Sequence, residues 1–340
     1  MPLSPLWQRR LAAFRAHRRG RVSLIVFCAV LLLSLAANLL ANDKPLVMEF
    51  RGQVYFPVFQ RIAEQKFGAQ FLPTEADFTN PAIQAAINRH GWMVWPPIRA
   101  SYGNIVWDAG PAPAPPGARD WLGTDGESRD VLARVLYGLR LSILFGFALT
   151  LAATALGILA GALQGFYGGL TDLLTQRFTE IWSGMPQLFL LIILASIIAP
   201  NFLTLLIFLL LFSWMPLSRL VRAEFLRARS LDYVRAAKAL GVPDWRIMLR
   251  HMLPNAAIAS LTFLPFMLAD SVTLLASLDF LGFGLPPGAP SLGELVTEAR
   301  DNLQAPWLAA TAFISLGGLL LLLIFIGEAV RDAFDPRRAP

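Results

Sequence analysis

Six long apolar stretches dominate this sequence and limit the folds open to it. The first, residues 22–41, is twenty residues long and carries no charge. At about 1.5 Å per residue, a helix of this length crosses the roughly 30 Å hydrocarbon core of a bilayer. The composition agrees, since 56% of the residues are hydrophobic and only 15% are charged, against about 45–50% and about 25% in soluble domains. The sequence therefore predicts an all-α polytopic membrane protein with six transmembrane helices, at about 22–41, 139–163, 181–199, 202–218, 256–278 and 308–327.

Most of the net charge of +6 lies in two basic blocks beside these stretches. Residues 219–250 hold eight Lys and Arg residues against three acids. Residues 1–21 contain no acid and six arginines: Arg9, Arg10, Arg15, Arg18, Arg19 and Arg21. Cytoplasmic segments carry such an excess of positive charge, so we expect both blocks, and with six spans both termini, on the cytoplasmic side of the membrane. The first span is too long for a signal peptide and shows no evident cleavage site, so we expect it to be retained.

Residues 42–137 separate the first two spans and are expected on the outer face of the membrane. Their charge is nearly balanced, with ten acids and nine Lys or Arg residues. Four tryptophans in this segment indicate that residues 45–110 can bury a small core: Trp92, Trp95, Trp107 and Trp121. The sequence PAPAPPGAR at 111–119 is typical of a stiff polyproline-type spacer.

The end of this segment has helical periodicity. The apolar residues Val131, Leu132, Val135 and Leu136 fall opposite Arg129, Asp130 and Arg134, which predicts an amphipathic helix lying in the outer membrane interface. Three nearby acids are Asp125, Glu127 and Asp130. They have two interpretations, a calcium site or a polar turn with a helix cap, and we favour the second.

Small residues and cysteine have structural interpretations. Gly157, Gly161, Gly165 and Gly169 are spaced four apart in the second span, a pattern that lets membrane helices approach closely. We interpret it as a packing ridge within the subunit, with a dimer face as the alternative. The single cysteine, Cys28, excludes a disulfide framework and is expected to fill apolar space.

Several catalytic chemistries have no support in the sequence. None of the three lysines follows a glycine, so a phosphate-binding P-loop is absent. The histidines His17, His90 and His251 all lie outside the expected spans, and no H-E-x-x-H or C-x-x-C pattern occurs. We therefore expect no enzymatic activity, no metal site and no cofactor in this chain.

The basic block after the fourth span contains a helix–turn–helix pattern, LDYVRAAKALGVPDWRIMLRHMLPNA, at residues 231–256. Ser230 is placed to cap its first helix, with Asp232 in the first turn. Gly241 suits the left-handed residue that ends a helix, and a second helix is expected from Pro243 through Leu249. DNA binding is an unsuitable interpretation for a unit tethered by membrane spans at both ends. One alternative is that the basic segment simply lies against anionic lipid headgroups. Docking into a cytoplasmic partner explains more of the pattern.

This stretch resembles a known motif. The sequence RAAKALG…HMLP is similar to the EAA loop of permease subunits in binding-protein-dependent ABC importers, with Arg235 where the motif has its glutamate. The sequences WLGTDGESRDVLARVLYGLRLSILFG, GFYGG, SLDFLGFGLPPGAPSLGEL and VRDAFDPR resemble the oligopeptide/dipeptide branch. ANDKPL, GWMVWPPIR and NLQAPWL are closest to the Yej-type permeases of peptide and microcin C importers.

The resemblance implies a type I ABC importer permease fold. Its five-helix core is expected at residues 138–340, with the EAA loop at 219–255 acting as the coupling helix that enters a cleft of an ATPase subunit. The implied coupling residues are Asp232, Arg235, Ala236, Ala237, Gly241, Leu253 and Pro254. The implied partners are a homologous second permease, two ATP-binding subunits that bind the ATP, a periplasmic peptide-binding protein and the lipid bilayer, with no nucleic acid.

Asp270 is the one acid well inside an expected span. An ionised group there costs at least about 2.5–3.5 kcal/mol by insertion scales, so it should face a polar interior. In the resembled family the fifth span helps to line the passage. Asp270, Ser271 and Thr273 are therefore candidates for the substrate path, the alternative being that Asp270 reaches outer-face water or pairs with a neighbouring subunit.

We conclude from the sequence that the chain is the permease subunit of an ATP-driven importer carrying peptides, including microcin C-like conjugates, from periplasm to cytoplasm. Two alternatives come from other classes. A secondary transporter would need intramembrane ion-coupling residues and an inverted repeat, and neither is evident. A membrane scaffold or receptor would lack an ATPase partner, so co-purification with a P-loop protein separates it from the importer.

Overall fold

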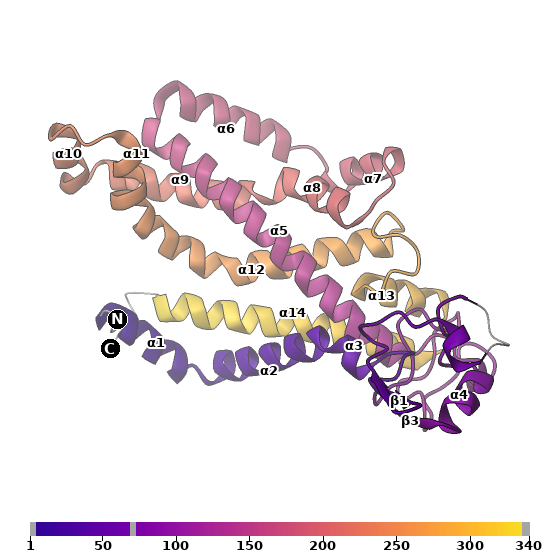
Figure 1. Ribbon diagram of the computed structural model, residues 1–340. Coiled ribbons are helices and arrows are strands. Elements are labelled where there is room, and N and C mark those ends of the chain that lie inside the picture. The colour runs from indigo at the N-terminus through magenta and orange to yellow at the C-terminus, as the bar shows by residue number, and fades with distance from the viewer. Residues whose placement is uncertain (1–4, 69–72, 335–340) are drawn as a thin grey trace. The chain divides into compact units, whose positions relative to one another are not determined.

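The computed structural model describes residues 5–68 and 73–334, and it divides into two compact units (Figure 1). Unit 1 comprises Met1–Cys28, Ser142–Pro287 and Gly318–Pro340, and unit 2 comprises Ala29–Leu141 and Gly288–Gly317. The expected boundary at 137/138 separates a periplasmic segment from a membrane core and stays a prediction. The return of the chain to unit 2 at 288–317 was not predicted. The last three residues of the VRDAFDPR sequence, 335–337, lie outside the described residues.

Unit 1 is helical. Its helices are α1 (Pro5–Ala16), α6 (Gly169–Ser183), α7 (Gln187–Ile197), α8 (Phe202–Ser213), α9 (Met215–Arg229), α10 (Asp232–Ala239), α11 (Asp244–Arg246), a π-helix (Ile247–Met252) and α12 (Leu253–Phe280). Three longer helices have residues in both units: α2 (Arg18–Leu35), α5 (Val131–Tyr167) and α14 (Pro306–Phe334).

Unit 2 contains a small sheet, so the chain is mostly helical and the all-α prediction is wrong in this detail. Its elements are α3 (Ala37–Leu40), β1 (Val47–Phe50), β2 (Gln53–Tyr55), α4 (Pro81–Asn88), β3 (Gly91–Val94), α13 (Leu292–Asp301) and two 3₁₀ helices (Glu64–Phe67 and Trp107–Ala109). The antiparallel strands have the order β2-β1-β3, with Met48 of β1 paired to Tyr55 and Met93. Arg51 and Gly52 both have positive φ in the two-residue β1–β2 turn, as the tightest hairpins require.

Residues 45–110 bury a core of their own, as the sequence predicted. One face of β1 contributes Met48 and Phe50, and the α4 face contributes Ile83 and Ile87, all nearly fully buried. Phe67 packs edge-to-face on Phe50, with ring centroids 5.2 Å apart. Buried and half-buried residues alternate along β1, as expected for a strand with one face on the core.

The described residues contain four helices long and apolar enough to cross a membrane, or five if one bent pair is a single span. These are Val131–Tyr167, Phe202–Arg229, Asp244–Phe280 and Pro306–Phe334, with the pair Gly169–Ser183 and Gln187–Ile197 bent by 77°. The prediction of six transmembrane helices is therefore not confirmed. The first expected span is interrupted at Ala36 between α2 and α3, and three arginines lie in the first turn of α2.

Two expected helices have different limits. The predicted helix 181–199 is wrong, because α6 ends at Ser183 and α7 begins at Gln187. Gly184 and Pro186 lie in the break, and a proline disfavours helical geometry in the residue before it. The predicted helix 202–218 continues as α8 and α9 to Arg229, since polar residues on the outer side do not stop a helix whose apolar face stays buried.

The predicted interfacial amphipathic helix is not a separate element but the first turns of α5. Asp130 caps it, because its Oδ1 accepts the Ala133 N–H at 2.6 Å, and this supports the polar-turn interpretation of the acidic residues. Arg134 was expected on the polar face, yet its side chain is fully buried. Burial also raises the pKa of the Asp130 carboxyl to about 6.

A buried ionic cluster in unit 2 explains the position of Arg134. Arg129 is 5% exposed, and its Nε lies 2.7 Å from Asp125 Oδ2 while its Nη2 lies 3.0 Å from Glu298 Oε1. Arg134 Nε lies 3.4 Å from the same Asp125 oxygen, and its Nη2 lies 3.9 Å from Glu294 Oε1. We call Asp125, Arg129, Arg134, Glu294 and Glu298 the unit 2 ion cluster. It joins the loop before α5 to α13.

The glycine spacing in α5 forms a packing ridge inside the subunit. A Cβ on Gly161 would lie 2.5 Å from Ser218 O of α9, and one on Gly165 would lie 2.5 Å from Phe225 Cβ. A Cβ on Gly157 would lie 3.0 Å from Leu217 Cβ of α9, whereas one on Gly169, which begins α6, would have nothing within 4 Å. Helices that pack on backbone atoms in this way need glycine at the contact.

Candidate functional site

The loop that resembles the EAA motif begins where α9 gives way to α10. Ser230 was expected to cap α10, but its Oγ donates to Arg227 O at 2.8 Å and so closes α9 instead. The residue at the cap position is Leu231, whose side chain cannot accept a hydrogen bond. Asp232 lies in the first turn of α10, as predicted, where its charge favours the helix dipole.

Gly241 ends α10 in the way the sequence predicted. Its φ is +73°, its N–H donates to Lys238 O at 3.0 Å, and the Val242 N–H donates to Ala237 O at 3.1 Å. This pair of hydrogen bonds is the Schellman motif, which needs a left-handed residue at the glycine position. The bend is therefore fixed by the local backbone.

The second helix of the loop is short and changes type. After the three residues of α11, Ile247–Met252 form a π-helix that leads into α12. Leu253 donates its N–H to Met248 O, five residues back, and Pro254 has no N–H to donate. Because a proline ring collides with the carbonyl four residues before it, the wider π turn accommodates Pro254. Leu253 and Pro254 thus mark the point where the loop joins α12.

One face of the loop is packed into the helices of unit 1. Val234, Ala237 and Ile247 are buried in one apolar cluster with Phe225 of α9 and Phe166 of α5. Close-packed protein interiors transmit displacements because there is little free volume to absorb them. The loop is therefore mechanically continuous with α5 and α9.

Polar contacts fasten the same region to the end of α5. Arg229 Nη1 donates to the carbonyls of Phe166 and Tyr167 at 3.3 and 3.2 Å. The Lys238 ammonium lies 4.5 Å from the centroid of the Phe166 ring. Such a contact adds about 0.5–1 kcal/mol at an exposed site.

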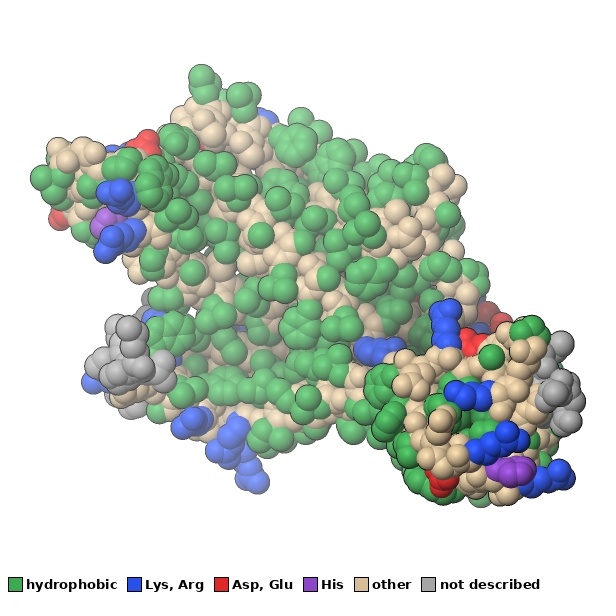
Figure 2. Space-filling model, in the orientation of Figure 1, with side chains coloured by type: hydrophobic (Ala, Val, Ile, Leu, Met, Phe, Trp, Pro, Cys, Tyr) green, Lys and Arg blue, Asp and Glu red, His purple; other side chains and the backbone are tan. Residues whose placement is uncertain are grey.

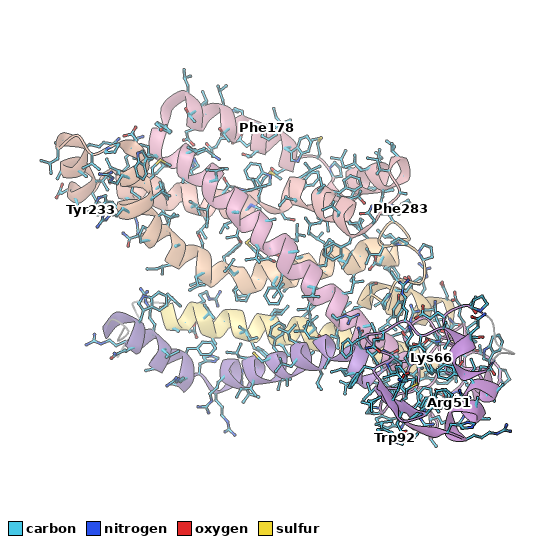
Figure 3. All side chains as sticks on the ribbon, in the orientation of Figure 1. Arg51, Lys66, Trp92, Phe178, Tyr233 and Phe283 are labelled. Carbon is cyan, nitrogen blue, oxygen red and sulfur yellow. The ribbon has the colours of Figure 1, made fainter. Side chains whose placement is uncertain are left out.

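The outer face of the loop is basic and carries large apolar side chains. Leu240 is 82% exposed and Trp245 is 60% exposed, with Tyr233 and Leu249 also exposed. In Figure 2, Lys, Arg and His side chains lie beside hydrophobic ones over the α10–α11 region, and Figure 3 labels Tyr233 there. We call the exposed residues Leu231, Tyr233, Leu240, Trp245 and Leu249 the outer loop patch. Large apolar groups at a protein's surface mark interaction sites.

The predicted coupling residues divide between the two faces. Asp232, Arg235, Ala236, Gly241 and Pro254 are exposed, Leu253 is half-buried and Ala237 is buried. The motif thus supplies both part of the loop's exposed surface and part of its internal anchor. The outer loop patch was missed by motif reasoning, although apolar residues within a basic segment outside the spans were a usable signal.

The candidate substrate-path residues lie in the second half of α12. Asp270 and Thr273 are exposed one turn apart on the same face of the helix. Ser271 is 3% exposed and faces α5, where its Oγ lies 3.3 Å from Thr150 Oγ1. The structure therefore brings Asp270 and Thr273 together and does not bring Ser271 to their face.

Comparison with known proteins identifies the family. Residues 153–340 match the binding-protein-dependent transport system inner membrane component family. The chain is 56% identical over 338 residues to the inner membrane ABC transporter permease protein YejE of Escherichia coli K12, with 99% of each chain covered. It is 52% identical over 360 residues to the peptidoglycan transport system permease protein YejE of Agrobacterium fabrum, covering 98% of this chain and 94% of that one. It is 35% identical over 222 residues to the oligopeptide transport system permease protein OppC of Lactococcus lactis subsp. lactis, covering 64% and 76%.

The chain belongs to the family of binding-protein-dependent transport system inner membrane components. The resemblance to permease subunits of binding-protein-dependent ABC importers, and its extension to the Yej-type permeases, is confirmed by these matches. The chain is a multi-pass inner membrane transport subunit, and this class favours the importer over a secondary transporter or a scaffold.

Proposed function

We propose that the chain is one of two homologous membrane subunits of an ATP-driven importer of peptides, including the peptide-bearing fragments of peptidoglycan. The relatives named for oligopeptide and peptidoglycan transport support this substrate class. A periplasmic binding protein delivers the peptide, and two cytoplasmic subunits bind and hydrolyse ATP. The chain itself carries out no catalysis. Transport of microcin C-like conjugates stays a prediction.

One observation carries the proposal, the two-faced construction of the loop. Its outer loop patch offers apolar anchors to a groove, and its inner face is packed against α5 and α9. Docked helices of this kind bind through a few apolar side chains in a groove of the partner. Movement of an ATPase that holds Leu240 and Trp245 would be passed to the spans through Val234 and Ala237.

A photo-crosslinking amino acid at Leu240 tests the docking directly. In membranes that contain the whole importer, we expect a crosslink from this position to the ATPase subunit. Leu303 of unit 2 is the matched control, since it is 84% exposed and also a leucine but is proposed to lie on the periplasmic side. A crosslink to the ATPase from Leu303, or none from Leu240 in an active complex, would contradict the proposal.

We further propose six spans with both termini in the cytoplasm, the break at Ala36 lying within the first span and the bent α6–α7 pair forming the third. The arrangement of unit 1 supports this, because α1 and α10, which belong to the two basic blocks, lie at the same end of its helices (Figure 1). Segments with excess Lys and Arg stay on the cytoplasmic side.

Cysteine labelling tests the orientation. On a Cys28→Ala background, an impermeant thiol reagent added to cells with a permeabilised outer membrane should modify Arg61→Cys, whose parent side chain is 92% exposed. Arg227→Cys, whose parent side chain is 74% exposed and lies outside the outer loop patch, should react only after the inner membrane is opened. The reverse pattern would overturn the orientation and, with it, the assignment of the loop to a cytoplasmic ATPase.

We also propose that Asp270 contacts cationic groups of the substrate. It shares an exposed face of α12 with Thr273, so it is available to the passage or to the second permease. Asp270→Asn keeps the size and polarity of the side chain. Uptake of peptides with added Lys or Arg should fall relative to neutral peptides, because charges about 4 Å apart attract by roughly 1–4 kcal/mol between the dielectrics of water and a protein surface.

A peptide competition assay measures this effect, with the yield of assembled complex as the control. A structural role for Asp270 predicts the same loss of uptake for every peptide, together with a lower yield. Unchanged discrimination by a well-assembled Asp270→Asn complex would remove Asp270 from the substrate path.

A further inference from the structure

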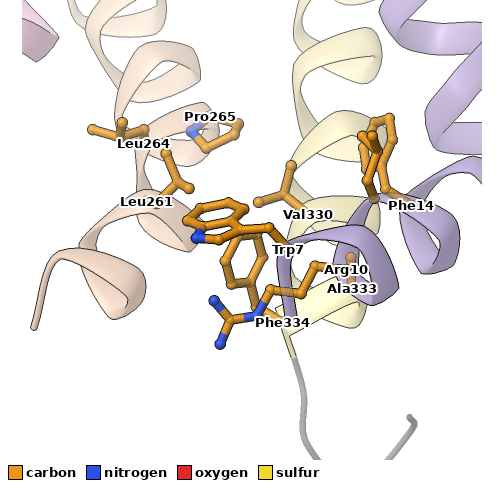
Figure 4. Close-up of a pocket in the computed structure, with 10 residues that line it drawn as sticks. Trp7, Arg10, Phe14, Leu261, Leu264, Pro265, Val330, Ala333 and Phe334 are labelled. Atoms are coloured by element: carbon orange, nitrogen blue, oxygen red, sulfur yellow. The ribbon is translucent and has the colours of Figure 1, made fainter. Parts of the chain in front are cut away.

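An apolar cavity of about 360 Å³ lies within unit 1 between α1, α12 and the last turns of α14 (Figure 4). Nine of the residues that line it are apolar, and the tenth is Arg10. Trp7 and Phe334 lie side by side, with Leu261 and Pro265 of α12 facing them. Its volume falls in the range of small-molecule sites, about 300–1,000 Å³. The coupling and transport functions proposed above do not use this cavity.

The sequence of α1 explains the apolar wall. Trp7, Leu11 and Phe14 are spaced four and three residues apart, so they share one face of the helix, and all three line the cavity. Arg9 and Arg15 are exposed. Tryptophan, leucine and phenylalanine beside arginines suit α1 to the interface between lipid headgroups and acyl chains.

Arg10 is held at the cavity by aromatic rings. Its guanidinium carbon lies 4.6 Å from the centroid of Phe334 and 5.5 Å from that of Trp7. The two rings pack edge-to-face with centroids 5.7 Å apart. Ring contacts fix the position of a guanidinium, whose five N–H donors suit bidentate binding of phosphate.

The lining selects the occupant by its chemistry. A water molecule needs two to four polar partners, and a peptide segment would lose the hydration of its backbone without compensation. A hydrocarbon chain needs neither polar partners nor hydration. The headgroup is selected by charge, since residues 1–21 carry six arginines and no acid, and basic pockets between membrane helices bind anionic headgroups.

We propose that this cavity holds one acyl chain of an anionic phospholipid whose phosphate binds Arg10. The lipid would join α1 to α12, the helix that continues directly from the coupling loop. The site requires only that α1 lies at a membrane surface. The lipid proposal is therefore independent of whether that surface is cytoplasmic or periplasmic.

Native mass spectrometry of the detergent-purified importer tests the proposal, with phosphatidylglycerol and phosphatidylcholine as probes. We expect one tightly retained phosphatidylglycerol per chain and preference for it over phosphatidylcholine. Arg10→Gln should lower retention about tenfold or more, because it removes a charge-assisted hydrogen bond to phosphate, which contributes about 1.5 kcal/mol or more. The matched control is Arg9→Gln, which removes the same charge from a residue that does not line the cavity.

A second variant tests the acyl chain separately. Ala333→Phe places a ring in the cavity and leaves Arg10 in place, so it should lower retention of both phospholipids. Equal losses in the Arg9 and Arg10 variants would show non-specific charge attraction and overturn the site. Equal binding of the two phospholipids, or a cavity covered by another subunit so that no lipid is retained, would overturn it as well.

Discussion

Gly241→Val should reduce ATP-driven uptake by about tenfold or more while leaving the importer assembled. The φ of +73° at this position costs a residue with a Cβ roughly 1–2 kcal/mol, and more for a β-branched one. A Cβ at Gly241 would meet nothing within 4 Å, so the effect arises from the backbone alone and not from a steric clash. About 1.4 kcal/mol corresponds to a factor of ten in the population of the bent loop. Uptake and the stimulation of ATP hydrolysis by loaded binding protein are the measurements.

Ala239→Val is the matched control for Gly241→Val. It adds the same side chain to an exposed position two residues earlier, within α10, where φ is helical. Gly241→Asn should fall between the two, because asparagine enters the left-handed region at lower cost than valine. Normal stimulated uptake by Gly241→Val would exclude a coupling role for the bend. Equal losses of uptake in the Ala239 and Gly241 variants would instead attribute the effect to the added side-chain volume.

The features predicted correctly from the sequence are those that depend on near neighbours. The stop at Gly241 follows from the glycine and the hydrogen-bonded turn around it, and the α5 ridge follows from glycines spaced four apart. The break between α6 and α7 was missed although Gly184 and Pro186 are sequence signals for a helix break. The apolar composition of 181–199 outweighed these two residues in the prediction.

The features that were missed depend on residues distant in the chain. Arg134 has the periodicity of a polar face, and its burial depends on Glu294 and Glu298 of α13, more than 150 residues later. The placement of 288–317 in unit 2 is equally non-local. Asp270, Ser271 and Thr273 were all candidates for the substrate path, but Ser271 lies on the face of α12 that packs against Thr150 of α5.

Arg129→Met should be the most destabilising single change in unit 2, lowering the free energy of unfolding by about 3–5 kcal/mol, the range for removing one partner of a buried ion pair. Arg129 lies within 3.0 Å of oxygens on Asp125, Glu127 and Glu298, and methionine keeps the length of its apolar stem without the charge. Arg134 then remains as the cation of the cluster, yet none of its guanidinium nitrogens has a hydrogen-bond partner within the described part of the chain. The thermal midpoint and the yield of the purified complex measure the loss.

Arg300→Met is the matched control, because Arg300 lies on the same helix as Glu298 but its pair with Asp301 is exposed. An exposed ion pair contributes little, so this variant should behave as the parent does. Asp125→Asn combined with Arg129→Met should cost less than the sum of the two single changes, since removing both charges leaves fewer buried groups unpaired. Strict additivity would contradict the cluster.

The pH dependence of Arg129→Met separates lost charge pairing from lost packing. Burial is the largest cause of the raised pKa of Glu298, the charge of Asp125 raises it further, and Arg129 and Arg134 lower it. Removing Arg129 therefore raises this pKa again. A carboxyl whose folded-state pKa is raised contributes stability at low pH and loses it as pH rises through that pKa. The deficit of Arg129→Met should accordingly be larger at pH 8 than at pH 5. A deficit of equal size at both values would assign the effect to packing of the arginine stem and not to the ion cluster.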